Sequence, residues 1–235
     1  MPGYKIDIAF VIDATGSMEP FMDMVKSRAL IAAEKIIQHM GNAGYQIENL
    51  RMRVIDFADF ASESTDTIHA SRFFNMPEER EEFKNRILGI EYEKRGGDIP
   101  ENALEALWVA MNSDWVDLPV GTKGRHIIVL VTDAPPLNLK ERLGCEGYVP
   151  EDYPEDISVM DEIWNEESMF GERITKMHPR YRRLVLFSPE GGDDAGHSWD
   201  NVSAWAHTIY VPVSPENGLI EVDFDILVNA IVRSV

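Results

Sequence analysis

The chain has 235 residues, of which 44% are hydrophobic and 27% are charged, and its formal net charge is −19. This composition is that of an ordinary globular protein, and the length is sufficient to bury a full core. A surface with 41 acidic against 22 basic residues repels phosphate backbones and anionic lipid, so we expect neither nucleic acid nor a membrane as a partner. The acidity is compatible with cation binding but does not by itself argue for a metal.

From the sequence we expect neither export nor membrane insertion. The longest apolar run, near Ile127 to Val131, is far too short to cross a bilayer. Lys5 and Asp7 interrupt the first apolar stretch, and no small-residue cleavage site follows. The single cysteine, Cys145, excludes an internal disulfide and fits a reducing compartment. We therefore expect a cytoplasmic protein, whose oligomeric state the sequence does not indicate.

The first predicted unit is a strand, a polar loop and a long helix. The segment from Tyr4 to Ile12 ends in four consecutive apolar residues, which is typical of a strand buried on both faces. The turn-rich stretch Asp13 to Ser17 follows, and Pro20 favours the opening of a helix. From Met22 onward, apolar residues recur every three or four positions up to Gly41, which predicts the end of the helix.

The next segments predict two strands, a short helix and a second polar loop. Strands are expected over Arg51 to Phe57 and over Thr67 to Phe74, and a helix over Pro77 to Leu88. The polar loop Gly96 to Glu101 leads into another helix, which runs through Leu104 to Met111.

The clearest strand of the chain is His126 to Thr132, because it contains five successive large apolar residues. It leads directly into a third polar loop, Asp133 to Pro136. Residues 137–155 lack periodicity and carry Gly, Pro and acid, so we expect a long loop insertion there. A helix is predicted over Asp156 to Met177. The elements expected beyond it are strands over Arg183 to Phe187 and His207 to Val211, a short helix around Trp199 to Trp205, and a last helix over Asp223 to Val232.

The alternation of strands and helices predicts the α/β class, with a Rossmann-like, mostly parallel central sheet covered by helices on both faces. One antiparallel strand is expected at an edge of the sheet. No linker-like stretch divides the pattern, so residues 1–235 are expected to form one domain. In such a fold, ligands bind at the carboxyl ends of the strands.

The three polar loops supply a set of oxygen donors at that edge. Their side chains are carboxylates and hydroxyls, without His or Cys, which disfavours zinc and iron–sulfur sites. A few carboxylates and hydroxyls, with room left for water, suit Mg²⁺, and Mn²⁺ or Ca²⁺ are possible substitutes. The candidate metal ligands are Asp13, Thr15, Ser17, Asp98, Glu101 and Asp133.

Two of the loops resemble the metal-ion-dependent adhesion site (MIDAS) of von Willebrand factor type A (vWA) domains. Asp13, Thr15 and Ser17 directly follow a buried strand, as in the first motif of that site. Asp133, at the end of the central strand and followed by Ala134 and proline, resembles its last motif. The resemblance extends in order and spacing over nearly the whole chain and implies a single vWA domain of the bacterial intracellular type.

The middle loop departs from the commoner family pattern. Many vWA domains have Gly-Gly-Thr and use the Thr as a ligand, whereas this chain has Asp98 after Gly96-Gly97. The sequence from Asp98 to Glu101 resembles the integrin β-chain variant, in which the Glu after Pro reaches the metal. The resemblance thus favours Glu101 as ligand, with Asp98 direct or water-mediated. Alternatively, Asp98 caps a helix and Glu101 closes a capping box.

The resemblance implies a non-enzymatic module that captures a protein partner through the metal. Asp13 and Asp133 would orient the ion, and the neutral hydroxyls of Thr15 and Ser17 would leave it electrophilic enough to take an Asp or Glu of the partner. Two alternatives stay open: an Mg²⁺-dependent phosphatase or hydrolase with Asp13 as nucleophile, and a metal-free scaffold. The hydrolase of the haloacid dehalogenase type requires a second Asp where this chain has Thr15.

One further polar segment, Gly191 to His197, contains two adjacent acids and a histidine. It could suggest a second cation site. We interpret it instead as an exposed turn that leads into a helix cap at Ser198.

Overall fold

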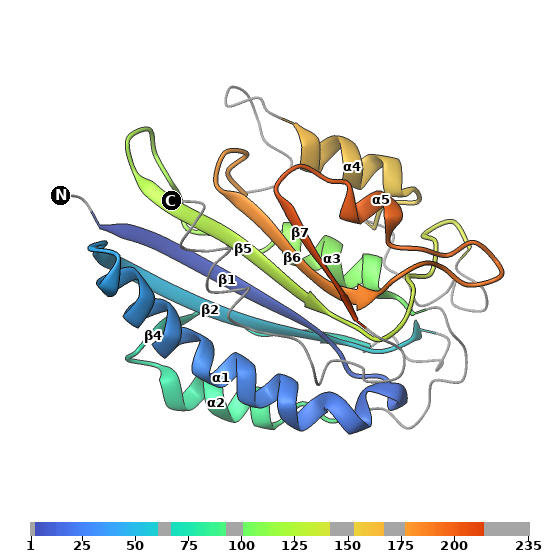
Figure 1. The fold of residues 1–235 in the computed structure, drawn as a ribbon, viewed down its shortest axis with the longest axis horizontal. Coiled ribbons are helices and arrows are strands. Elements are labelled where there is room, and N and C mark those ends of the chain that lie inside the picture. The colour runs from blue at the N-terminus through green and yellow to red at the C-terminus, as the bar shows by residue number, and fades with distance from the viewer. Residues whose placement is uncertain (1–2, 61–66, 93–100, 142–152, 167–176, 214–235) are drawn as a thin grey trace.

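The computed structural model describes residues 3–60, 67–92, 101–141, 153–166 and 177–213. Within these ranges the chain forms one sheet with strand order β3-β2-β1-β5-β6-β7, and β4 also pairs with β2 (Figure 1). The strands are β1 (Tyr4–Asp13), β2 (Ile47–Phe57), β3 (Ile68–Ala70), β4 (Phe74–Met76), β5 (Lys123–Val131), β6 (Arg182–Pro189) and β7 (Thr208–Val213). The helices are the 3₁₀ turn η1 (Gly16–Met18), α1 (Glu19–Asn42), α2 (Arg80–Leu88), α3 (Ala103–Met111), α4 (Ile157–Asn165) and α5 (Asp200–Ser203).

The sheet is mixed but mostly parallel, which confirms the predicted fold class. Strands β2, β1, β5, β6 and β7 run parallel to one another. The edge beyond β2 is antiparallel, as expected, but two short strands share it. They replace the single strand predicted over Thr67 to Phe74. Between them, Ser71 forms hydrogen bonds with the backbone of Val54, and Arg72 pairs with Glu79 and Glu82 instead of continuing the strand.

Helices cover both faces of the sheet, since alternate residues of the central strands enter two separate cores. On one face, the even-numbered apolar residues of β1 pack with α1 and α2. On the other face, Ala9 and Val11 pack with α3, α4 and α5. Figure 1 shows α1 and α2 together on one side of the sheet and α3 to α5 on the other. The strand β1 is almost fully buried, which explains its continuous apolar sequence.

The predicted helix over Asp156 to Met177 is not continuous, because α4 ends at Asn165; residues 167–176 of the prediction lie outside the described ranges. Asp156 caps its start by accepting a hydrogen bond from the backbone N–H of Ser158. At the other end, Glu166 has an extended backbone, and the Arg182 guanidinium donates to its carbonyl oxygen at 2.8 Å. Acidic residues at this end, Glu162 and Glu166, also oppose the helix dipole, which favours an early stop.

Several expectations fall on residues outside the described ranges: Cys145, most of the predicted 137–155 insertion and the last helix, Asp223 to Val232. The described parts of that insertion, residues 137–141 and 153–155, contain neither helix nor strand. Among the described helices, none combines the length and the apolar character needed to cross a membrane.

Candidate functional site

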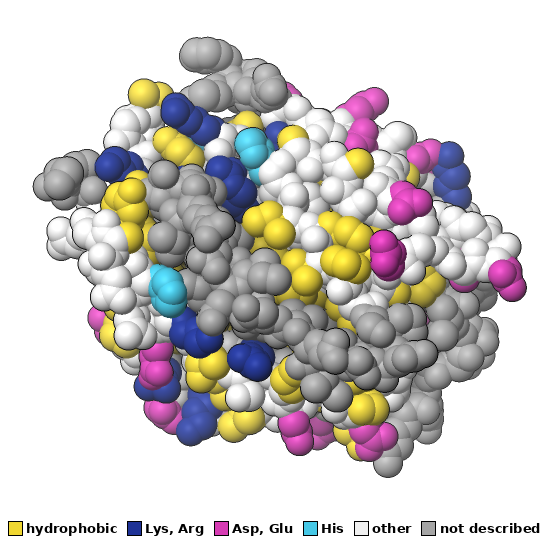
Figure 2. All heavy atoms as spheres, in the orientation of Figure 1, with side chains coloured by type: hydrophobic (Ala, Val, Ile, Leu, Met, Phe, Trp, Pro, Cys, Tyr) yellow, Lys and Arg dark blue, Asp and Glu magenta, His cyan; other side chains and the backbone are white. Residues whose placement is uncertain are grey.

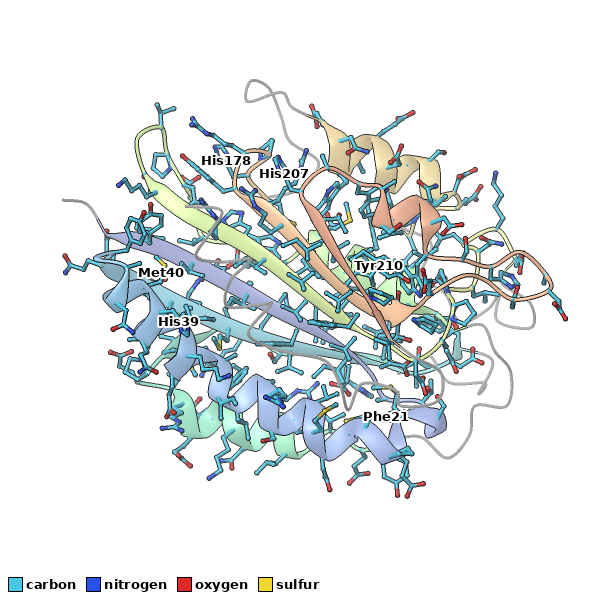
Figure 3. All side chains as sticks on the ribbon, in the orientation of Figure 1. Phe21, His39, Met40, His178, His207 and Tyr210 are labelled. Atoms are coloured by element: carbon cyan, nitrogen blue, oxygen red, sulfur yellow. The ribbon has the colours of Figure 1, made fainter. Side chains whose placement is uncertain are left out.

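The candidate site lies at the carboxyl ends of β1 and β5, where the order of the sheet reverses. From β1 the chain proceeds through α1 to β2 on one side, and later returns to β5 on the other side of β1. In an open α/β sheet this switch point leaves a crevice between the diverging connections. Figure 3 shows that α1 begins beside this edge, since Phe21 lies near the strand ends and His39 lies at the far end of the helix.

A chain of hydrogen bonds joins the first and third predicted loops. The Asp13 carboxylate accepts from the backbone N–H of Thr15 at 2.9 Å and from its hydroxyl at 2.6 Å. The Thr15 and Ser17 hydroxyl oxygens are 3.2 Å apart, and the Ser17 hydroxyl donates to the Asp133 carboxylate at 2.9 Å. Four residues that sequence reasoning grouped as metal ligands, Asp13, Thr15, Ser17 and Asp133, therefore form one connected cluster.

Thr132, at the end of β5, holds the second carboxylate oxygen of Asp13. Its hydroxyl donates to Asp13 Oδ2 at 2.6 Å and accepts from the backbone N–H of Ala134 at 3.2 Å. Both oxygens of Asp13 are thus fixed by donors, in a position that is fully buried. Sequence reasoning did not assign Thr132 to the site, although its place directly before Asp133 was the available signal.

Glu101 reaches the same edge from the segment before α3. Its backbone N–H donates to Pro135 at 3.1 Å and its carbonyl accepts from Leu137 at 2.7 Å, which aligns it with the loop that follows Asp133. The side chain is 4% exposed, and its Oε2 atom has no hydrogen-bond partner. A buried carboxylate oxygen without a donor is costly, and a bound cation would remove that cost.

The alternative capping role of Glu101 is not observed. A capping box places the Glu three residues inside the helix, but α3 begins at Ala103 with Asn102 as its first flanking residue. Glu101 therefore precedes the helix. Asp98, the other candidate of this loop, lies outside the described residues, and so do Gly96 and Gly97.

The carboxylates of the site have raised pKa values, because burial disfavours their charged forms. Burial raises the pKa of Asp13 to about 6, despite hydrogen bonds from Thr132 and Thr15. Burial, followed by the charges of Asp13, Asp59 and Asp133, raises the pKa of Glu101 to about 9. Burial also raises the pKa of Asp133. Without a cation, the carboxyl groups of the site thus resist full ionisation. A bound cation would favour their ionised forms.

Asp59 is a second residue of this region that sequence reasoning missed. It follows the end of β2, is 3% exposed, and contributes to the raised pKa of Glu101. Next to it, the backbone N–H of Phe60 donates to the Asn102 side chain at 2.9 Å, so this loop contacts the start of α3. The signal was its place after β2, since β1, β2 and β5 all end at one edge.

The residues present fit a hard divalent cation, with hydroxyl oxygens as an essential part of the donor set. In the described part of the chain, no group of three or more His, Cys, Asp and Glu side chains is arranged to hold a metal ion. The connected cluster instead combines the carboxylates of Asp13 and Asp133 with the hydroxyls of Thr15 and Ser17. Such an all-oxygen set with few charges suits Mg²⁺, which keeps several of its water ligands.

The interpretation of Gly191 to His197 as an exposed turn leading to a cap at Ser198 is wrong for the histidine. His197 is buried, and its two ring nitrogens contact Glu141 and Asp193. The helix α5 begins at Asp200, and the contact of its N–H with the Ser198 hydroxyl is long, at 3.5 Å. The error arose because Glu141 is 56 residues away in sequence and gives no local signal.

Comparison with known proteins adds little to this geometry. No family model matches the chain, and no curated protein matches its sequence. Solved structures with a similar arrangement include proximal thread matrix protein 1 from the mussel byssus, at 12% identity and a TM-score of 0.49, which is aligned over 98% of this chain and 46% of its own. Another is the pilus adhesin SpaC from Lactobacillus rhamnosus GG in its open conformation, at 18% identity and a TM-score of 0.42, over 57% of this chain and 15% of the adhesin. The chain thus spans less than half the length of either protein, and neither likeness carries an argument about function.

Proposed function

We propose that this chain is a protein-binding module of the von Willebrand factor type A kind, which captures a partner through one divalent cation and has no catalytic activity of its own. The observation that carries the proposal is the hydrogen-bonded cluster of Asp13, Thr15, Ser17 and Asp133 at the switch point of the sheet. These residues come from two loops that are more than a hundred residues apart, and their polar atoms converge on one place.

The donor set supports a cation that stays electrophilic. Asp13 and Asp133 would hold the ion with two charges, and Thr15 and Ser17 would add neutral oxygens. When bound, Mg²⁺ supplies a positive centre that attracts an anionic oxygen, such as a carboxylate of a partner protein. Ser17 is exposed and Asp133 is half-buried, so this side of the cluster faces the solvent from which a partner approaches.

Glu101 sets how strongly the site attracts an acidic partner. Its side chain is buried beside the cluster and protonated near neutral pH in the absence of a cation, because its pKa is raised to about 9. If Glu101 ionises on metal binding, the added negative charge weakens the attraction for another carboxylate. If Glu101 stays protonated, it adds no negative charge, and the ion attracts the carboxylate of the partner more strongly. Asp98 is proposed as a further, direct or water-mediated ligand from the same loop.

Calorimetry with MgCl₂ and with MnCl₂ tests the metal site directly. We expect one ion per chain, and binding that is lost in Asp13→Asn. The absence of binding at millimolar metal, with the circular dichroism spectrum of a folded protein, contradicts the proposal. The variants Asp98→Thr and Asp98→Ala test the loop residue: binding kept by Thr and lost by Ala supports Asp98 as a direct ligand.

Partner capture tests the function. A pulldown with the intact chain should recover a partner in Mg²⁺ and lose it in chelator, and the variant Asp13→Asn should lose it in both. Binding that is insensitive to chelator and to this substitution identifies a metal-free scaffold instead. Turnover of a phosphate ester such as p-nitrophenyl phosphate, abolished in Asp13→Asn, identifies the hydrolase alternative.

A further inference from the structure

His197 joins two loops beside the candidate site through both of its ring nitrogens. Its Nε2 atom lies 2.7 Å from Glu141 Oε2, and its Nδ1 atom lies 2.6 Å from Asp193 Oδ2. The side chain is only 6% exposed, so water competes little for either contact. Glu141 belongs to the segment that follows β5, and Asp193 to the loop that follows β6.

The geometry of the two carboxylates favours a protonated imidazole. The other oxygen of Glu141 accepts from the Asn138 side chain at 2.9 Å. The other oxygen of Asp193 accepts from the backbone N–H groups of Ala195 and His197, both at 2.9 Å. Neither carboxylate can turn away without losing these bonds. A neutral imidazole has one N–H, so it satisfies one carboxylate and presents a lone pair to the other, whereas the imidazolium donates to both.

The two loops that His197 joins also meet directly next to the cluster. The Trp199 indole N–H donates to the carbonyl of Ala134 at 3.0 Å, and Ala134 directly follows Asp133. Trp199 is 1% exposed, so this contact is shielded from solvent. Movement of the loop after β6 would therefore alter the support of the segment that carries Asp133.

We propose that His197 is a proton-operated latch, which in its charged form holds the loop after β6 against the segment after β5 and so keeps Asp133 in place. Loss of the proton leaves one of the two carboxylates facing a lone pair and releases the latch. The effect on metal binding rests on the proposed function, but the latch itself does not.

The charges around the latch favour the protonated form. Burial lowers the pKa of His197, but the hydrogen bonds to Glu141 and Asp193 outweigh it and leave the pKa raised. In turn, hydrogen bonds from Asn138 and His197 lower the pKa of Glu141, and the bond to His197 is the largest cause of the lowered pKa of Asp193. Within the described parts of the joined segments, the other charged groups are Asp133, Lys140, which pairs with Asp156 at the start of α4, Glu155, Glu190, Asp194 and Asp200.

The pH dependence follows from these directions. His197 has a higher pKa in the folded protein than its ordinary 6.5, so its contribution to stability is complete below pH 6.5 and is lost as the pH rises through the folded pKa. Glu141 and Asp193 have lowered pKa values, so their contributions are complete above their ordinary values of 4.5 and 3.8 and are lost at lower pH. The latch is therefore fully closed between about pH 4.5 and 6.5 and opens on the alkaline side.

Nuclear magnetic resonance of the whole chain tests the latch without any metal. The His197 ring should titrate above pH 6.5 and move back toward that value in Glu141→Gln, which keeps the size of the partner but removes its charge. Exchange of the Trp199 indole proton should become about tenfold faster or more in His197→Gln at pH 6. His39, which is exposed on α1, serves as an internal reference, and His39→Gln as the control variant.

The latch is refuted if His197 titrates at or below 6.5, or if indole exchange is the same in His197→Gln as in the wild type. Comparison of Mg²⁺ affinities then tests the coupling. The Mg²⁺ association constant of the wild type, divided by that of His197→Gln, should be largest near pH 6 and approach one at alkaline pH. A quotient that does not change with pH refutes the coupling. If no metal binds but His197 titrates as expected, the proposed function fails and the latch stands.

Discussion

At the scale of single residues, Asp133 differs from the other carboxylates of the cluster in its exposure. It is half-buried, whereas Asp13 and Glu101 are enclosed. Its hydrogen bond to Ser17 is also its link to the first loop. Burial is the main cause of the raised pKa values of Asp13 and Glu101, and the charge of Asp133 adds to both. The three carboxylates therefore repel one another when no cation is present.

We therefore predict that Asp133→Ala abolishes metal binding but leaves stability in chelator unchanged or slightly higher. Removal of one of several neighbouring carboxylates relieves repulsion in the metal-free protein. Calorimetry measures the first effect and urea unfolding in EDTA the second. Asp23→Ala, an exposed acid on α1, is the control for a general loss of charge. If Asp133→Ala does not fold, Asp133 has a structural role and the expectation is wrong.

Glu101 offers a second test, because its ordinary state near neutral pH is the protonated one. Glu101→Gln imitates that state, so in chelator at pH 7 we expect little change in stability. If Glu101 is a ligand, the variant should bind Mg²⁺ about tenfold more weakly or worse, which corresponds to about 1.4 kcal/mol.

A pKa of about 9 for Glu101 also implies proton release when the metal binds at pH 7. Calorimetry in two buffers with different ionisation enthalpies measures that proton. The wild type should release more protons than Glu101→Gln. Equal release and equal affinity would remove Glu101 from the ligand set.

At the scale of elements, the sequence predicted the central strands well, because short continuous apolar runs such as Ile127 to Val131 are typical of strands buried on both faces of a sheet. The predictions were wrong where tertiary contacts determine the ends of elements or the burial of a side chain. β2 begins at Ile47, four residues before the prediction, since pairing with β1 extends it through a polar stretch. The end of α4 and the burial of His197 depend on Arg182 and Glu141, both distant in sequence.

In the candidate site, too, some residues were predicted from the sequence and others were missed. Asp13, Thr15, Ser17 and Asp133 were predicted to lie together, because parallel strands bring their carboxyl ends to one edge of the sheet. Asp59 was missed because its one signal, its place after β2, is shared by the other acids of the same loop.

Two glycines test how tightly the elements pack. A Cβ on Gly124 would lie 2.5 Å from a Leu118 methyl group and 2.7 Å from the Lys5 carbonyl oxygen, so Gly124 lets the loop before β5 and the β1 backbone approach closely. We predict that Gly124→Ala lowers the free energy of unfolding by about 1–3 kcal/mol.

The matched control is Gly41→Ala in α1, where an added Cβ meets nothing within 4 Å. It should raise the free energy of unfolding by about 0.5 kcal/mol, because Ala is the better helix former. Urea unfolding of both variants measures the two effects. A neutral result for Gly124→Ala would show that Leu118 moves aside at little cost.

At the scale of the whole molecule, the net charge of −19 makes the fold sensitive to any salt. On the face drawn in Figure 2, basic side chains gather mostly on one side, and acidic ones predominate on the other. Screening by NaCl should therefore raise the free energy of unfolding even without a specific site.

A specific site adds to this general effect. At equal ionic strength, Mg²⁺ at a hundred times its dissociation constant should stabilise the wild type by about 2.7 kcal/mol more than NaCl. This additional stabilisation by Mg²⁺ should vanish in Asp133→Ala, whereas the stabilisation by screening should remain. If the free energy of unfolding of the wild type rises equally with ionic strength in the two salts, Mg²⁺ acts by screening alone.

The place of β1 in the middle of the sheet has a consequence for the synthesis of the chain. On the ribosome, β1 emerges before the other strands of this sheet and can pair with β2 on one side, but its other edge stays open until β5 is complete, more than a hundred residues later. An open hydrophobic strand edge invites wrong pairing with other chains. That edge of β1 thus has no partner strand over a long stretch of synthesis, and Asp13 and Asp133 cannot meet before translation has passed residue 133. Whatever the cluster binds, it can be bound only by a chain whose β5 has already been made.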